Sequence, residues 1–215
     1  MPTYVVYTQA GSSTPSWDSY PLRHVAAGES WTTIHSATTG THEYSTQSFL
    51  QMRIQSHDTA TNMFVGIYRV MMNFDTSSIP THEIVTSVSL SLYGDNILEN
   101  FGNGRPLQIT AHTFTATPPT LAAYNRTYYG STVFGTAPTL TTASWNTYTL
   151  DTGIVVPGNI TRVAIRDKRD YDNTPPTWVA GKITRYQYIS ADAGWATPYL
   201  TVTTVVPLAS QVILL

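Results

Sequence analysis

Oxygen-bearing side chains cluster in one short stretch of the chain, RDKRDYDNTPP, at residues 166–176. These candidate metal ligands are Asp167, Asp170, Asp172 and Asn173. Carboxylate and amide oxygens gathered in one loop are the ligands that Ca²⁺ prefers. Lys168 and Arg169 lie between the acids, so a solvated loop with local ion pairs is the alternative, and we weigh it more heavily. The sequence leaves a structural calcium ion as the minor of two interpretations.

Aromatic side chains are the candidates for contact with a glycan or another partner. They are Trp178, Tyr186, Tyr188, Trp195, Tyr128 and Tyr129. Sugar rings stack through their C–H faces on aromatic surfaces, which combine a large apolar area with a polar edge. Tyr186 and Tyr188 share one face of an expected strand, and that face either meets a ligand or closes the core. Tyr128 and Tyr129 precede Gly130, and we expect them to be exposed contact residues.

The acid–base groups form no recognisable catalytic or zinc-binding pattern. The six histidines never reach an H-x-E-x-H or H-E-x-x-H spacing, and no G-x-S-x-G nucleophile elbow occurs. The carboxylates are dispersed, so nothing nominates a pair for glycoside hydrolysis. We therefore predict a protein without enzymatic activity and without a cofactor other than the possible calcium, and keep a glycan hydrolase as a minor alternative.

Composition excludes several classes of partner. The net charge is -2, with only two lysines and nine dispersed arginines, so no basic stripe could neutralise a row of phosphates, and we expect no nucleic acid. No run approaches the ~18 apolar residues of a membrane span, and we expect no membrane partner. The chain has no cysteine, and this leaves the redox compartment undetermined.

The elements expected around these residues are mostly strands. Thr is abundant, with 36 residues, and charged residues make up only 11%, as suits half-buried strands. Alternating apolar residues between turn signals predict nine strands, at 4–8, 48–55, 64–74, 85–94, 106–116, 144–151, 160–167, 182–190 and 198–206. The only predicted helix is a short one in PPTLAAYNR, where Thr120 can cap the first turn. The sequence therefore predicts an all-β antiparallel jelly-roll sandwich of about nine strands with one short helix.

One segment resembles a known family. YRVMMNFDTSSIPTHEIVTSVSLSLYG is similar to the recurring pattern of the DNRLRE-type domain, a jelly roll related to disaggregatase-associated carbohydrate-binding modules. The matching residues are Arg69, Phe74, Asp75, Ser77, Ile79, Pro80, Val88, Leu90, Leu92 and Tyr93. Weaker similarities follow at 121–124, 144–153 and 196–204, so the resemblance covers roughly residues 64–204. It implies a jelly-roll fold and binding of carbohydrate.

The two ends differ from the middle of the chain. We predict an N-terminal arm at 1–27, a jelly-roll domain at 28–206 and an apolar C-terminal tail at 207–215. A free apolar tail is an exposed patch, and such patches often mark contacts. The residues predicted to contact neighbouring subunits are Val212, Ile213, Leu214 and Leu215. The alternative is that the tail folds back over its own sandwich.

Two functions of different classes follow from these patterns. The first is a virion structural protein, such as a bacteriophage capsid decoration or an accessory head or tail subunit, bound to other virion proteins and to copies of itself. The sequence as given begins with no basic segment followed by an apolar one, so we expect no secretory signal and release by lysis. The second is a carbohydrate-binding module that attaches to a polysaccharide or a cell-surface glycan outside the cell.

Overall fold

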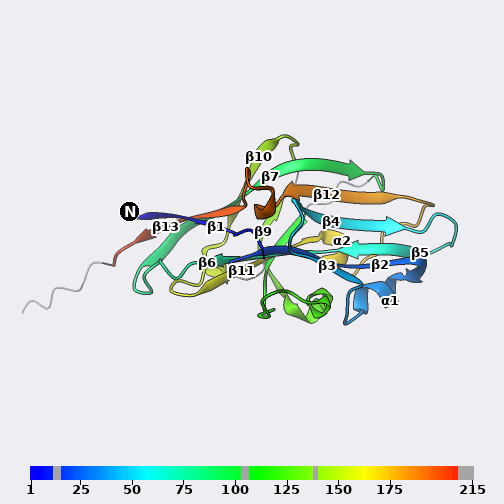
Figure 1. Cartoon of the computed structure of the whole chain (residues 1–215), viewed down its shortest axis with the longest axis horizontal. Coiled ribbons are helices and arrows are strands. Elements are labelled where there is room, and N and C mark those ends of the chain that lie inside the picture. Colours follow the sequence, from blue (N-terminus) through cyan, green and yellow to red (C-terminus); the bar gives the residue numbers. More distant parts are fainter. Residues whose placement is uncertain (12–15, 103–106, 138–139, 208–215) are drawn as a thin grey trace, which may run out of the picture.

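The chain folds into an antiparallel β-sandwich (Figure 1). The computed structural model describes residues 1–11, 16–102, 107–137 and 140–207. Its strands are β1 (Thr3–Tyr7), β2 (Asp18–Ser30), β3 (His42–Tyr44), β4 (Phe49–Ser56), β5 (Met63–Tyr68), β6 (Val70–Asp75), β7 (Ile84–Glu99), β8 (Leu107–His112), β9 (Tyr129–Ala137), β10 (Ser144–Leu150), β11 (Ile160–Asp167), β12 (Ile183–Ile189) and β13 (Tyr199–Val205). The predicted all-β class is confirmed, and the number of strands exceeds the nine predicted.

The strands are arranged in two layers that share β2. The path across the sheet runs β1-β13-β7-β12-β4-β5-β2-β6-β11-β8-β9, with β10 beside β7 and β3 beside β2. Leu22 to Ser30 of β2 pair with β5 in the first layer, whereas Asp18 and Ser19 pair with β6 in the second. The main hydrophobic core takes residues from both layers, which is how a sandwich buries one face of each strand.

The helices are short. They are α1 (Trp31–Ser36), α2 (Lys168–Tyr171) and the 3₁₀ turns η1 (Leu121–Tyr124), η2 (Arg126–Tyr128), η3 (Thr152–Ile154) and η4 (Ala191–Ala193). The predicted helix after Thr120 is therefore the single 3₁₀ turn η1, and Thr120 gives it no side-chain cap. Helix α1 was not predicted from the sequence. Ser30 caps it by accepting a hydrogen bond from the Thr33 backbone N–H at 3.2 Å.

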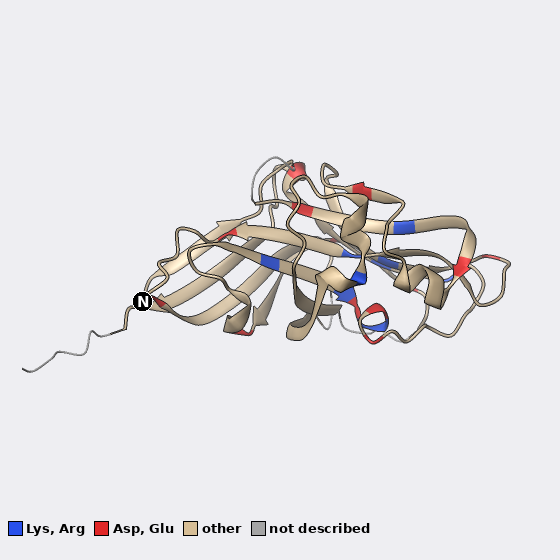
Figure 2. Cartoon of the chain, turned by 90° about the horizontal axis from the view of Figure 1, so that it is seen from below, with Lys and Arg blue, Asp and Glu red and all other residues tan. Residues whose placement is uncertain are grey.

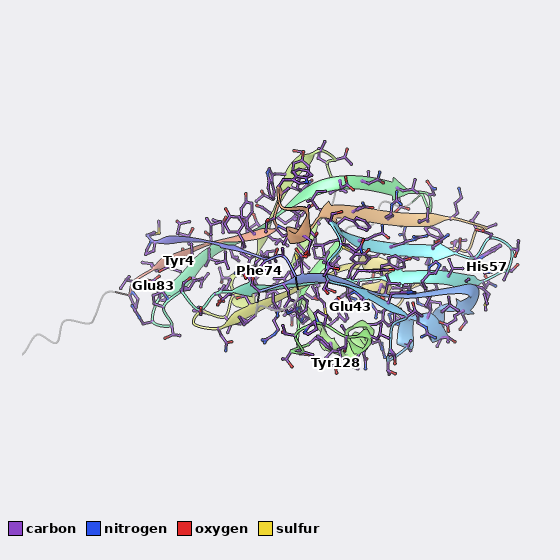
Figure 3. All side chains as sticks on the ribbon, viewed as in Figure 1. Tyr4, Glu43, His57, Phe74, Glu83 and Tyr128 are labelled. Carbon is purple, nitrogen blue, oxygen red and sulfur yellow. The ribbon has the colours of Figure 1, made fainter. Side chains whose placement is uncertain are left out.

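Core packing explains the stretch that resembles a known family. Phe74 and Ile79 are fully buried on either side of the bend, and Asp75 accepts the Ser77 backbone N–H at 3.0 Å within it. Figure 3 shows Phe74 in the interior of the sandwich. The predicted strand 64–74 is interrupted at Arg69, which separates β5 from β6. Arg69 is fully buried and donates to the carboxylate of Asp170.

The predicted alternation in β7 is confirmed. Val88, Leu90 and Leu92 are buried in the core, whereas Ser87 and Ser89 face outward. Residues directly opposite each other on paired strands point to the same face. The alternation in β7 therefore decides which residues of its partner strands point into the core and which point outward.

The segment predicted as an N-terminal arm belongs to the sheet. β1 pairs with β13 of the same chain over its whole length, and β2 packs between β5 and β6. The Tyr4 hydroxyl also donates to the Glu83 carboxylate at 3.1 Å, and the two residues lie together at one end of the molecule (Figure 3). The sequence predicted a strand at 4–8, which is β1, but did not predict β2. Of the predicted tail, Val212, Ile213, Leu214 and Leu215 lie outside the described residues.

Candidate functional site

Five aromatic rings form a connected row on the outer face of the sandwich. This aromatic row consists of Tyr7, Tyr199, Trp145, Tyr93 and Trp195. Successive ring centroids lie 5.5 Å apart from Tyr7 to Tyr199, 5.1 Å from Tyr199 to Trp145, 5.6 Å from Trp145 to Tyr93 and 4.9 Å from Tyr93 to Trp195. These separations lie in the range of favourable aromatic pairs, so the rings hold one another in place.

Strand pairing brings the row together from distant parts of the sequence. Tyr7 of β1 lies opposite Tyr199 of β13, and Tyr93 of β7 lies opposite Trp145 of β10. Tyr93 has the same parity as the outward serines of β7, so its partner Trp145 also faces outward. Trp195 comes from the loop after η4 and completes the row against Tyr93.

The row is accessible, and its neighbours on the strands are uncharged. Trp195 is 63% exposed, Tyr7 52% and Trp145 42%. The outward residues at neighbouring registers of the four strands are Val5, Thr201, Ser89, Thr147 and Thr149, whereas Ser91, at the same parity, is buried. Figure 2 shows few charged residues toward the N-terminal end of the molecule, where β1 and β13 lie. A neutral, hydroxyl-rich surface with exposed rings suits a polar, uncharged ligand.

An open cleft adjoins the row along β10. Its volume is about 710 Å³, and its walls are residues 133–136 of β9 and residues 146–149 of β10, with Asp151 at one end. Trp145 of the row and Thr147 of the cleft lie on the same face of β10, two residues apart, so the cleft begins beside the row. The Thr147 hydroxyl lies 3.0 Å from the Ser91 hydroxyl and lines the cleft. The site therefore combines aromatic rings with a neighbouring groove that offers hydroxyl groups.

Three of the predicted contact residues are buried instead of exposed. Tyr188 and Tyr186 lie in the main core, where the Tyr188 hydroxyl is 3.2 Å from that of Tyr148. Tyr129 packs in a second core cluster and donates to the Ala123 carbonyl at 3.2 Å. Burial raises the pKa of all three phenols. Arg185 and Gln187, which alternate with the two tyrosines along β12, lie on the opposite, outer face of that strand.

The remaining three predicted aromatic residues lie in three different environments. Trp195 is exposed and belongs to the aromatic row. Trp178 is half-buried and donates from Nε1 to the Met63 carbonyl at 3.1 Å, away from the row. Tyr128 is half-buried and meets the Phe114 ring edge-on, with centroids 5.0 Å apart. The prediction thus found one member of the row and missed Tyr7, Tyr93, Trp145 and Tyr199.

The predicted calcium loop is an ion-pair cluster. Asp170 is almost fully buried and binds Arg69 through two hydrogen bonds, of 2.9 and 2.7 Å, and the Arg166 Nε at 2.8 Å. Burial alone would raise the pKa of Asp170, but Arg166 and Arg69 outweigh it and hold that pKa far below its usual range. The carboxylate therefore has its lone pairs occupied by guanidinium groups.

The other predicted calcium ligands also have partners. Asp167 accepts the Arg169 backbone N–H at 2.7 Å and caps α2, and Asp172 pairs with Lys168 at 2.8 Å. Burial raises the pKa of Asp167 to about 6, although Arg169 opposes the shift. Asn173 accepts a hydrogen bond from the Trp31 indole at 3.0 Å. Within the described ranges, no three His, Cys, Asp or Glu side chains are grouped so as to hold a metal ion. The acids are therefore ion-paired, as the alternative expected, but Asp167 and Asp170 are buried and not solvated.

No family model and no curated protein matches the chain. The resemblance to the DNRLRE-type domain therefore stays a prediction. Among the described residues, no helix is long and apolar enough to cross a membrane.

Proposed function

We propose that this protein is a non-enzymatic carbohydrate-binding module whose glycan lies on the aromatic row. The observation that supports the proposal is a connected row of five rings, of which Tyr7, Trp145 and Trp195 are exposed and Tyr93 and Tyr199 are half-buried. The residues beside it on the strands are uncharged and mostly bear hydroxyl groups. Burial of such rings against a ligand contributes most of the binding free energy in a typical hot spot, and the hydroxyl groups set orientation.

The geometry of the row indicates how a saccharide is held. The interplanar angles between successive rings run from 48° to 88°, so the row is faceted and not flat. Each exposed face can stack on a different sugar unit, and a chain that follows the row must twist from one unit to the next. The β9–β10 cleft accepts hydroxyl groups on the side of the row marked by Thr147.

A binding screen against soluble polysaccharides tests the proposal. The expected result is saturable binding of the intact chain to at least one glycan, lost in Trp195→Ala and Trp145→Ala. Trp178→Ala is the matched control, because Trp178 is outside the row and should leave affinity unchanged. Absence of saturable binding to a broad panel, or equal binding by all three variants, would contradict the proposal.

The same exposed row could serve contact between protein subunits, as the virion hypothesis requires. Sedimentation of the same variants separates the two functions. A glycan-binding module keeps one oligomeric state across wild type, Trp195→Ala and Trp145→Ala, whereas a subunit interface through the row changes state with them. The placement of the protein in a virion stays a prediction, and the residues predicted to contact neighbouring subunits, Val212 to Leu215, lie outside the described part of the chain.

A further inference from the structure

A second, smaller cleft of about 320 Å³ lies away from the aromatic row. This cationic cleft is lined by His35, Arg126, Thr127, Tyr129, Gly130, Ser131, Arg166 and Tyr171. Its walls come from α1, η2, the start of β9, the end of β11 and α2. Tyr128, which Figure 3 labels, marks the η2 side. A volume of this size is at the lower end of small-molecule sites and suits a single sugar unit.

The charged residues that line the cleft are both arginines. Arg166 is buried, and its Nε and Nη2 bind Asp170 at 2.8 and 2.7 Å, which leaves its Nη1 without a hydrogen bond to any described residue. Arg126 is exposed and makes no ion pair with the described residues. Behind the wall, Arg69 shares Asp170 with Arg166, so that trio has a net charge of +1, and Arg126 adds another. The cleft therefore favours an anion.

One of the residues that line this cleft, His35, carries a buried acceptor. His35 is 1% exposed, and its Nε2 lies 2.9 Å from the Asp170 carbonyl, so Nε2 must carry the proton and donate. Its Nδ1 then bears a lone pair and has no partner among the described residues. Burial lowers the pKa of His35 despite the nearby Asp170, and this keeps the ring neutral. A buried acceptor left unpaired is costly, which points to a ligand that donates a hydrogen bond there.

A hydroxyl donor lies on the rim of the cleft. The Tyr171 hydroxyl donates to the Ser131 carbonyl at 2.5 Å and ties α2 to β9, whereas the Ser131 hydroxyl bonds to no described residue. The Thr127 hydroxyl donates to Asn125 at 3.0 Å and so offers its lone pairs to the cleft. The lining thus presents guanidinium and hydroxyl donors together with acceptors.

We infer that the cationic cleft binds an acidic sugar unit, with the carboxylate on Arg126 and Arg166 and an adjacent hydroxyl donating to His35 Nδ1. An inorganic oxyanion satisfies the arginines but not the imidazole acceptor, and a neutral sugar satisfies the acceptor but not the arginines. β9 lines both clefts, at residues 129–131 and at 133–136, so one strand leads from this site to the groove beside the aromatic row. That the ligand is a sugar rests on the proposed glycan binding. That it is an anion rests on the two arginines alone.

Calorimetric titration at fixed ionic strength tests the site, with glucuronate, sulfate and glucose as probes. Glucuronate should bind saturably and more tightly than sulfate, and glucose should not bind measurably. Arg126→Gln should weaken glucuronate binding about tenfold, because one charge-assisted contact is lost from an exposed residue that does not support the fold. Arg185→Gln, which removes the same charge from β12, is the control and should change nothing.

Three results would overturn the inference: no saturable binding of glucuronate, equal affinity for sulfate and glucuronate, or an affinity unaffected by Arg126→Gln. Failure here is distinguishable from failure of the proposed function. Trp145→Ala should leave glucuronate binding intact while it abolishes binding of a neutral polysaccharide. Arg126→Gln should weaken glucuronate binding and leave binding of the neutral polysaccharide intact.

Discussion

Tyr93 and Trp145 are direct cross-strand partners in β7 and β10, and their rings meet edge to face with centroids 5.6 Å apart. This pair joins the two halves of the aromatic row, since Trp145 continues to Tyr199 and Tyr93 continues to Trp195. Both residues point outward, because Tyr93 alternates with the buried residues of β7 and Trp145 with those of β10. The strand register of the fold therefore creates the candidate binding surface.

Removal of the exposed rings of the aromatic row should lower the affinity for glycan but leave the fold stable. Trp195 is 63% exposed, so Trp195→Ala should lower the free energy of unfolding by less than about 1 kcal/mol. Urea denaturation checks this value alongside the glycan titration. A loss of several kcal/mol would mean that Trp195 has a structural role, and loss of binding in that variant would then not locate the glycan.

Asp170→Asn should destabilise the fold strongly. The change leaves Arg69 and Arg166 buried without a counter-charge, and we expect a loss of about 3–5 kcal/mol. Asp172→Asn is the matched control, because its pair with Lys168 is largely in solvent and should contribute at most about 1 kcal/mol. Chemical denaturation of both variants gives the comparison, and similar losses in the two would contradict the account of the cluster.

Asp18 should make stability fall as pH rises from about 4 to 7. Burial raises its pKa to about 7, although the Ala191 N–H and the Thr8 hydroxyl donate to it and oppose the shift. The folded chain then binds more protons than the unfolded chain between the unfolded pKa of about 3.9 and the folded value, so the free energy of unfolding decreases through this window.

Asp18→Asn removes this titration. Its free energy of unfolding should decline less than that of wild type from pH 4 to pH 7, with the difference between the two declines at most about 4 kcal/mol. Urea unfolding at half-unit pH steps gives both curves. If the two curves run parallel, Asp18 does not titrate in this range in the folded protein.

Calcium should leave thermal stability unchanged. The carboxylates of the 166–176 stretch are already paired with Arg69, Arg166, Arg169 and Lys168. Melting curves in millimolar Ca²⁺ and in excess chelator should therefore coincide. A saturable rise in melting temperature with Ca²⁺ would show that the ion displaces these pairs, because a ligand that binds only the folded state raises stability.

Local sequence patterns predicted the strands better than they predicted the site. The alternation around Leu90 and the Phe74–Pro80 bend were recognisable because periodicity is a local property. Strand β2 was not predicted, because its polar and glycine-containing sequence lacks clear alternation, although it joins both layers.

The candidate site could not be predicted without knowing which strands pair and in which register. Tyr7 and Tyr199 come from opposite ends of the chain, and only the β1–β13 register shows that they meet. Asp170 looked like a calcium ligand because its partner Arg69 lies 101 residues away in the sequence. One local signal was available: Trp145 and Tyr93 both lie at the outward parity of their strands, where a large aromatic residue is exposed unless it is covered.

The most direct test of the central claim is a titration of wild type, the double variant Trp145→Ala/Trp195→Ala and the control Trp178→Ala with the best glycan from the screen. The account predicts saturable binding by wild type and Trp178→Ala, and loss of at least about tenfold in affinity in the double variant with its fold intact by circular dichroism. A folded double variant that binds the glycan as tightly as wild type would contradict the claim that the aromatic row is the binding site.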